Sequence, residues 1–242
     1  MKVRLDVEMA RRGLSSSRSQ AENIIRLSQV EVNGRIATKA GQMVDETARI
    51  RLLLDKQYVS RAGLKLASVA GGFGVDFTGK TVLDIGSSTG GFTDYALQHG
   101  AKRVIAVDVG TDQLHPTLRA DERIELHEKT DIRDFTTDQE LDIVVCDVSF
   151  ISLREILPHV ASSLMGPETV LLAMVKPQFE AGRAQVNKGV IKNDRVRRQI
   201  LGDFEDWVRR YFIIIDKRDS EVAGQKGNLE RFYQLSRAKR QT

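Results

Sequence analysis

The chain has 242 residues, of which 41% are hydrophobic, 29% are charged and one is cysteine. This composition supports one α/β domain with a real core plus a small module. No apolar run approaches the roughly 18 residues of a membrane-spanning helix, and a single cysteine excludes an internal disulfide. The sequence enters an amphipathic pattern directly after its first residues, so we expect no signal peptide and a cytoplasmic protein.

The positive charge is concentrated in the N-terminal quarter. Residues 1–60 hold 11 Lys and Arg against 7 Asp and Glu, a net charge of +4, whereas residues 61–242 hold 26 of each sign. A basic module on a neutral domain suggests that the module contacts a polyanion. Four surplus charges are equally compatible with a solvated helix face.

The first 50 residues predict two short helices followed by a small β unit. Residues 5–12 are helix-like with Gly13 as a stop, and residues 17–20 (Ser-Arg-Ser-Gln) form a capping-box pattern for a second helix to about residue 27. An alternating run at 30–32 and a tight Asn33-Gly34 turn predict a hairpin that returns through residues 35–37.

These residues resemble the S4 RNA-binding domain. The matching positions are Arg4-Leu5-Asp6, Gly13-Leu14, Ser17-Arg18, Ala21, Val30, Val32 and Asn33-Gly34, whereas Ser28 stands where the family usually has glycine. The resemblance implies that exposed basic residues of the two helices contact RNA. The candidates for RNA binding are Arg4, Arg11, Arg12, Arg18 and Arg26, together with Arg61 beyond the module.

The remaining sequence alternates between strand-like and helix-like segments. The strand-like runs lie at 81–86, 103–109, 123–128, 141–148, 169–176 and 211–216, and the helix-like runs at 91–99, about 152–164 and 193–209. A final alternating run at 229–235 can close the sheet as an antiparallel strand. We therefore predict a Rossmann-like α/β domain with a mostly parallel seven-stranded sheet. The expected division is an α+β module at 1–54, a linker at 55–60 and the α/β domain at 61–242.

The most informative segment is a glycine-rich loop, residues 84–92 (Asp-Ile-Gly-Ser-Ser-Thr-Gly-Gly-Phe), between the first strand and its helix. Such a loop brings backbone N–H groups close to a ligand, and Asp108 at the end of the next strand can accept hydrogen bonds from ribose hydroxyls. The loop has Ser88 where a dinucleotide site has its second glycine, and it begins with an acid. The pattern favours the cationic S-adenosylmethionine over NAD, and an unliganded glycine turn is the third alternative.

We assign the cofactor site to the loop, to the end of the next strand and to one residue expected beside the adenine. The predicted cofactor residues are Asp84, Gly86, Ser87, Ser88, Thr89, Gly90, Gly91, Phe92, Asp108, Val109 and Asp131. No metal site is predicted.

Two later strands end in residues suited to catalysis, Asp147 and Lys176. Methyltransferases that act on base amines resemble one another in an Asp/Asn-Pro-Pro-aromatic motif, and here Val148-Ser149 replaces the prolines. A nucleophilic role for Cys146 is poorly supported because no activating group is apparent. A lysine at a strand end beside an acid suits methyl transfer to a hydroxyl, although a lone lysine is more often a surface residue.

The chain as a whole resembles the hemolysin-like TlyA family of ribosomal RNA 2′-O-methyltransferases, in which an S4 domain precedes an FtsJ-type domain. The similar segments are residues 59–66, 84–92, 107–110, 147–153, 175–182 and 224–230. The FtsJ-type Lys-Asp-Lys-Glu tetrad falls on Lys65, Asp147, Lys176 and Glu230. The resemblance implies methylation of a ribose 2′-hydroxyl, with cytidine as the expected nucleoside and ribosomal RNA or ribosomal subunits as partner. A membrane-lytic protein and an RNA-binding protein with an inactive catalytic domain are the competing readings.

Overall fold

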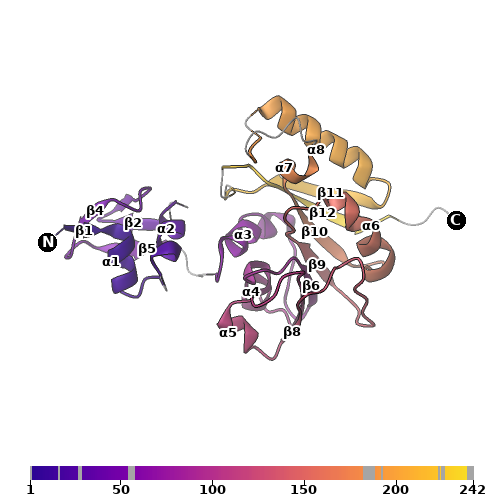
Figure 1. The fold of residues 1–242 in the computed structure, drawn as a ribbon, viewed down its shortest axis with the longest axis horizontal. Coiled ribbons are helices and arrows are strands. Elements are labelled where there is room, and N and C mark those ends of the chain that lie inside the picture. The colour runs from indigo at the N-terminus through magenta and orange to yellow at the C-terminus, as the bar shows by residue number, and fades with distance from the viewer. Residues whose placement is uncertain are drawn as a thin grey trace. The chain divides into compact units, whose positions relative to one another are not determined.

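The computed structural model describes residues 2–15, 17–26, 29–53, 58–181, 189–191, 193–222, 224 and 227–238, without the side chains of Asn23 and Arg26. The chain divides into two compact units, Met1–Arg61 and Ala62–Thr242 (Figure 1). The predicted linker at 55–60 lies partly outside the described residues.

The N-terminal unit combines two helices with two small antiparallel sheets. The helices are α1 (Leu5–Arg11) and α2 (Arg18–Arg26), one sheet pairs β1 (Lys2–Arg4) with β4 (Met43–Asp45), and the other has the order β3 (Arg35–Ile36), β2 (Val30–Val32), β5 (Ile50–Leu52). The Ser17 hydroxyl accepts a hydrogen bond from the Gln20 N–H at 3.1 Å, as the capping pattern predicts. The sequence did not reveal β1, β4 and β5, because these three-residue strands lack the adjacent Asn-Gly turn that marked the equally short β2.

The C-terminal unit is built on one seven-stranded sheet with the order β11-β12-β10-β9-β6-β7-β8. Its strands are β6 (Thr81–Ile85), β7 (Arg103–Val107), β8 (Ile124–His127), β9 (Ile143–Cys146), β10 (Val170–Val175), β11 (Phe212–Asp219) and β12 (Arg231–Arg237). All neighbours pair in parallel except β12, which is antiparallel to both β10 and β11. The predicted mostly parallel sheet is confirmed. The last strand does not extend the edge but inserts between β10 and β11.

Helices cover both faces of this sheet (Figure 1). They are α3 (Arg61–Phe73), α4 (Gly91–Gln98), α5 (Pro116–Arg119), α6 (Leu157–His159), α7 (Pro177–Glu180) and α8 (Asp194–Val208). Phe232 packs against Phe92 of α4, and its neighbour Tyr233 packs against Phe204 of α8. Because successive strand residues point to opposite faces, α4 and α8 lie on opposite sides of the sheet.

The helix predicted at 152–164 is not continuous. It consists of a 3-10 turn at Leu153–Glu155, the short α6 and a π-helical turn at Val160–Leu164. Pro158 sits in the first turn of α6, where its missing N–H is tolerated but where it cannot extend a preceding helix. The apolar pattern is nevertheless used as predicted, since Leu157, Val160 and Leu164 are all buried in the core of the sheet.

Candidate active site

A cavity of about 410 Å³ opens where the parallel strands β6, β7 and β9 end. Ligands in open α/β sheets bind at the carboxyl ends of strands, and this volume is within the usual range for a small-molecule site. The lining residues are Ile85, Gly86, Ser88, Val107, Asp108, Val109, Gln113, Thr130, Asp131, Ile132, Asp147, Val148, Ser149, Phe150, Ile151 and Ile156.

The turn after β6 requires glycine at two positions. Gly86 has φ +79°, and a Cβ there would lie 2.9 Å from the Asp147 carbonyl oxygen. Gly90 has φ +93°, and a Cβ there would lie 2.4 Å from the Leu118 side chain. Any side chain at either position would collide with its neighbour and strain the backbone. The glycines therefore bring the loop against the end of β9 and start α4 beneath it.

Asp108 fixes the shape of the loop. Its Oδ2 accepts a hydrogen bond from the Ser88 N–H at 2.8 Å, and its Oδ1 accepts one from the Gly110 N–H at 2.7 Å. The first bond holds Ser88 in the left-handed region, at φ 46°. An ionised carboxylate has about four acceptor sites, so Asp108 retains capacity for ligand hydroxyls after these two bonds.

Asp84 is a buried acid directly under the loop. Its Oδ2 accepts hydrogen bonds from the Thr93 N–H at 2.9 Å and from the Thr93 hydroxyl at 2.6 Å. Among the described residues, its Oδ1 and the Ser87 hydroxyl oxygen are buried atoms without a hydrogen-bond partner. Burial is the main cause that raises the pKa of Asp84 to about 7, and the charges of Asp147 and Asp108 add to it, while the Thr93 bonds oppose it.

We expect Asp84→Asn to remove a pH dependence of stability. The unfolded carboxyl ionises near pH 3.9 and the folded one near 7, so the wild type loses stability as pH rises through this window. Asparagine keeps an acceptor for Thr93 but cannot ionise. Urea unfolding at about pH 5 and about pH 8 should therefore show a smaller decrease in the free energy of unfolding for the variant. An undiminished decrease would mean that other groups cause it.

The four residues of the predicted tetrad form two ion pairs. Lys176 Nζ lies 2.6 Å from Asp147 Oδ1 and donates to the Ser149 hydroxyl at 2.7 Å. Lys65, on α3, pairs with the Glu230 carboxylate. Both lysine side chains are almost buried, with 10% and 11% of their surface exposed.

Strand register brings these pairs together at the carboxyl ends of the parallel strands. In the antiparallel β10–β12 ladder, Val175 is opposite Arg231, so the next position along places Lys176 beside Glu230. The Asp147 N–H donates to the Ile85 carbonyl at 3.0 Å, which ties the end of β9 to the glycine loop. Lys176 and Glu230 therefore lie side by side, and Lys176 contacts Asp147, which lines the cavity.

The predicted cofactor residues divide into those that line the cavity and those that do not. Gly86, Ser88, Asp108, Val109 and Asp131 line the cavity. Asp84, Ser87, Thr89, Gly90, Gly91 and Phe92 do not line it. Phe92 is buried and contacts Phe232, so its position serves the core. Asp131 pairs with Arg133 at 2.6 Å, and this hydrogen-bonded contact lowers the pKa of Asp131 to about 2.

Sequence reasoning missed Ser149, Phe150 and Gln113. Gln113 accepts a hydrogen bond from the Ser88 hydroxyl at 3.1 Å. Phe150 is 92% exposed, has φ 67° and lies 5.3 Å from the Phe179 ring, measured between ring centroids. A bulky residue with positive φ and an exposed ring is unusual. For Phe150, the only signal in the residue pattern was an apolar residue directly after Asp147-Val148-Ser149, the segment that follows β9.

In the N-terminal unit, two predicted RNA-binding arginines surround Asp6. Asp6 is fully buried and pairs with Arg4 at 2.8 Å and with Arg18 at 3.2 Å. The Arg4 hydrogen bond is the largest cause that lowers the pKa of Asp6 to about 2, despite its burial. Arg4 and Arg18 keep about half of their side-chain surface exposed, at 46% and 57%. They can still present N–H groups to a ligand.

Arg11 and Arg12 share a second buried acid, Glu8. Arg11 Nη2 and Arg12 Nε lie 2.7 Å and 2.6 Å from Glu8 Oε1. Arg12 also donates to the carbonyls of Ala48 and Glu46, so it fastens α1 to the loop before β5. Arg11 is 63% exposed and Arg12 only 24%. Arg12 is therefore mainly structural, and the side chain of Arg26 lies outside the described residues. Arg61 is the first residue of α3.

Comparison with protein families agrees with this geometry. Residues 58–237 match the model of the FtsJ-like methyltransferases. The chain belongs to the FtsJ-like methyltransferase family. Residues 3–50 match the S4 domain. The predicted family, the S4 module and the Rossmann-like methyltransferase fold are thereby confirmed.

Relatives of this methyltransferase match over nearly their full length. Hemolysin A of Brachyspira hyodysenteriae is 39% identical, over 94% of this chain and 97% of the relative. The 16S/23S rRNA (cytidine-2′-O)-methyltransferase TlyA of Mycobacterium tuberculosis is 35% identical, over 97% and 90%. A solved hemolysin-family structure from Streptococcus thermophilus is 37% identical, has a TM-score of 0.73 and matches 98% of this chain and 89% of its own.

Among the residues that the structure describes, none of the helices of this methyltransferase has the length and hydrophobicity that crossing a membrane requires. No group of three or more His, Cys, Asp or Glu in the same residues could hold a metal ion.

Proposed function

We propose that this methyltransferase uses S-adenosylmethionine to methylate a ribose 2′-hydroxyl in ribosomal RNA, with cytidine as the nucleoside. The observation that carries the proposal is the pair of Lys–carboxylate contacts, Lys176–Asp147 and Lys65–Glu230, the first of which adjoins the cavity through Asp147. An amine-directed site would need groups that hold a planar base amine. Lysine N–H groups beside carboxylates suit an oxygen that must lose a proton.

The residues around the cavity fit the proposed cofactor. Asp84 and Ser87 do not line the cavity, but in the described part of the chain Asp84 Oδ1 and the Ser87 hydroxyl lack partners in and under its glycine loop, and a donor such as an ammonium group that reached them would satisfy them. A nearby positive charge would also favour the ionised form of Asp84, whose burial otherwise opposes it. Asp108 can accept hydrogen bonds from ribose hydroxyls, and Asp131 lies in the same cavity as a candidate acceptor for an adenine amine. When bound, the cofactor supplies an electrophilic methyl group on a positively charged sulfur.

The chemistry of the chain's own residues concerns the ribose oxygen. The hydroxyl must lose its proton as the oxygen accepts the methyl group that the cofactor would supply, with the cofactor sulfur as the leaving group. Lys176 donates to the Ser149 hydroxyl and forms an ion pair with Asp147, which leaves at least one of its three N–H bonds for the oxygen. That N–H orients the hydroxyl and stabilises the developing negative charge. The proton passes to the Asp147 carboxylate, which lines the cavity, because the Lys176 ammonium has no lone pair to accept it.

The relatives and the S4 module support the choice of substrate. Two of the matching proteins are named as rRNA (cytidine-2′-O)-methyltransferases, from Campylobacter jejuni at 41% identity and from Mycobacterium tuberculosis at 35%. The S4 module carries the chain's whole net positive charge of +4, which favours a polyanionic partner. The exposed Phe150 ring beside Ser149 offers an apolar face on which a nucleobase can stack.

The function is tested by mapping ribose methylation in ribosomal RNA by mass spectrometry, from cells with and without this gene. We expect at least one 2′-O-methylcytidine to disappear without the gene. A plasmid copy of the wild type should restore it, and the Lys176→Ala variant should not. An unchanged ribose methylation pattern would contradict the proposed substrate.

A further inference from the structure

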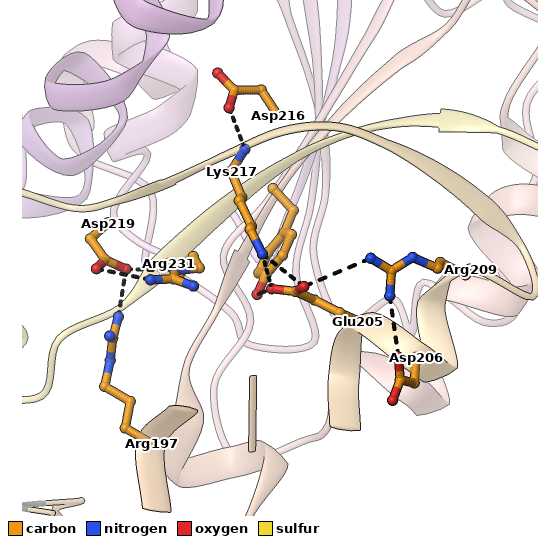
Figure 2. Close-up of polar contacts among 9 residues, drawn as sticks. Arg197, Glu205, Asp206, Arg209, Asp216, Lys217, Asp219 and Arg231 are labelled. Atoms are coloured by element: carbon orange, nitrogen blue, oxygen red, sulfur yellow. Dashed lines mark hydrogen bonds and ion pairs between the residues drawn. The ribbon is translucent and has the colours of Figure 1, made fainter. Parts of the chain in front are cut away.

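An arginine–aspartate network lies behind Glu230. Figure 2 shows Asp219, on β11, between Arg231 of β12 and Arg197 of α8. Asp219 Oδ1 lies 2.5 Å from Arg197 Nη2 and 2.7 Å from Arg231 Nε, and its Oδ2 accepts from Arg231 Nη2 at 3.1 Å. Burial opposes ionisation of Asp219, but the hydrogen bonds from Arg231 and Arg197 outweigh it and lower the pKa.

The network holds the backbone on both sides of Glu230. Arg197 Nε donates to the Leu229 carbonyl at 3.0 Å, while its Nη2 binds Asp219. The Ser220 N–H donates to the Glu230 carbonyl at 2.9 Å. The Arg231 side chain is held by Asp219, its ladder partner on β11. Three consecutive residues, 229 to 231, are therefore each tied to α8, to β11 or to Ser220, which directly follows β11.

Glu230 and Arg231 point to opposite faces of the sheet because strand side chains alternate. Glu230 thus lies on the face of α3 and Lys65, and the network lies on the face of α8. Arg197 is nine-tenths buried. Burying an arginine costs desolvation free energy, so a buried ion pair need not stabilise the fold. The informative property of Arg197 is therefore the geometry of its contacts. The guanidinium is a planar fork that can bind a carbonyl and a carboxylate at once, which a lysine ammonium does less well.

We propose that Arg197 is a positioning residue that, together with Asp219 and Arg231, sets the backbone at Leu229–Arg231 so that the Glu230 carboxylate meets Lys65. The inference rests on the proposed role of the Lys65–Glu230 pair in methyl transfer. In the described structure the polar partners of Arg197 are Leu229 and Asp219. Neither is Lys65 or a residue that lines the cavity. Arg197 acts through the backbone of residue 229, and displacement by about 1 Å can cost about a hundredfold in rate.

The same three elements supply a matched control, the cluster around Glu205. The Glu205 carboxylate accepts from Lys217 Nζ at 2.8 Å (Figure 2). It also accepts from the Tyr233 hydroxyl at 2.9 Å. Glu205 is as buried as Arg197, and its partners also lie on β11 and β12. In the described structure Glu205 itself contacts none of residues 229–231. Its partner Tyr233 does interact with Arg231, but glutamine at 205 keeps an acceptor for the Tyr233 hydroxyl. Glu205→Gln should lower the melting temperature without moving Glu230.

The test is a double-mutant cycle in the full chain. Single-turnover transfer of a labelled methyl group to ribosomal RNA is measured for Arg197→Gln, Glu230→Gln and both together. We expect Arg197→Gln to lower the rate about tenfold or more in the wild-type background and less than about threefold when Glu230 is already glutamine. Calorimetric binding of S-adenosylhomocysteine should stay unchanged in both single variants, and Glu205→Gln should keep its rate within about twofold.

Each other outcome decides against the inference. Equal losses from Arg197→Gln in the two backgrounds would show that Arg197 acts independently of Glu230. Equal losses in Arg197→Gln and Glu205→Gln would show a general effect of weakened packing, and this comparison decides even if the Glu230→Gln reaction is too slow to measure. A full rate for Glu230→Gln would instead refute the catalytic role of Glu230, and the positioning role of Arg197 would go with it.

Discussion

Lys176→Ala is expected to lower the rate of methyl transfer by more than about a hundredfold while leaving cofactor binding nearly intact. In the proposed function Lys176 meets the acceptor oxygen, and its amine contacts Asp147 and Ser149. The cofactor loop is held by other groups, chiefly Asp108 through the Ser88 and Gly110 amides. Single-turnover kinetics on ribosomal RNA, combined with calorimetry of S-adenosylhomocysteine, separates the two effects.

Lys80 provides the matched control for this substitution. It forms a Lys–Asp pair with Asp142 at 3.1 Å, between the starts of the strands β6 and β9 whose far ends carry the site. Lys80→Ala removes the same kind of contact at the opposite ends of these strands. The Lys80→Ala variant should therefore methylate ribosomal RNA at the normal rate. Asp108→Ala should show the reverse of the Lys176 profile, with weakened cofactor binding. Near-normal turnover of Lys176→Ala on ribosomal RNA would exclude it as the catalytic group.

Removing residues 1–57 is expected to abolish productive methylation of ribosomal RNA without loss of cofactor binding. The FtsJ-like match begins at residue 58, so the truncation leaves the methyltransferase domain complete. What remains carries 26 basic and 26 acidic residues, so its long-range attraction for RNA is weak. RNA affinity measured across a salt series, together with calorimetry of S-adenosylhomocysteine, tests both parts. Binding and methylation by the truncated protein at full-chain levels would remove the RNA-anchoring role from the module.

Substitutions within the module test which of its arginines contribute to RNA binding. Arg4, Arg11 and Arg18 are the better-exposed arginines of the two acid-centred clusters, whereas Arg12 would disturb the fold. Replacing these three together should weaken RNA binding and reduce the salt slope by roughly 0.7 per lost phosphate contact. An equal charge change at Arg103, Arg123 and Arg209, each also paired with an acid, is the control. Equal weakening by the control set would mean that net charge alone matters.

The local features of this protein could be predicted from its sequence. The glycine loop from Asp84 to Phe92, the capped start of α2 and the Asn33-Gly34 turn all depend on residues within a few positions of one another. The pairings of Glu8 with Arg11 and Arg12 follow the helical spacing of three and four residues and could also have been recognised. The family resemblance further located the four tetrad residues. It did not predict their pairing.

Tertiary structure alone decided how distant segments meet. The sequence pattern showed that residues 229–235 form a strand but not that β12 inserts between β10 and β11, because a strand's alternation records only which faces are buried and not its neighbours. That insertion places Glu230 beside Lys176, and it brings Arg231 to Asp219 and Arg197. Charge on a basic helix likewise did not reveal that Asp6 holds Arg18 from 12 residues away. Such contacts depend on packing between elements, and nothing in the local sequence records them.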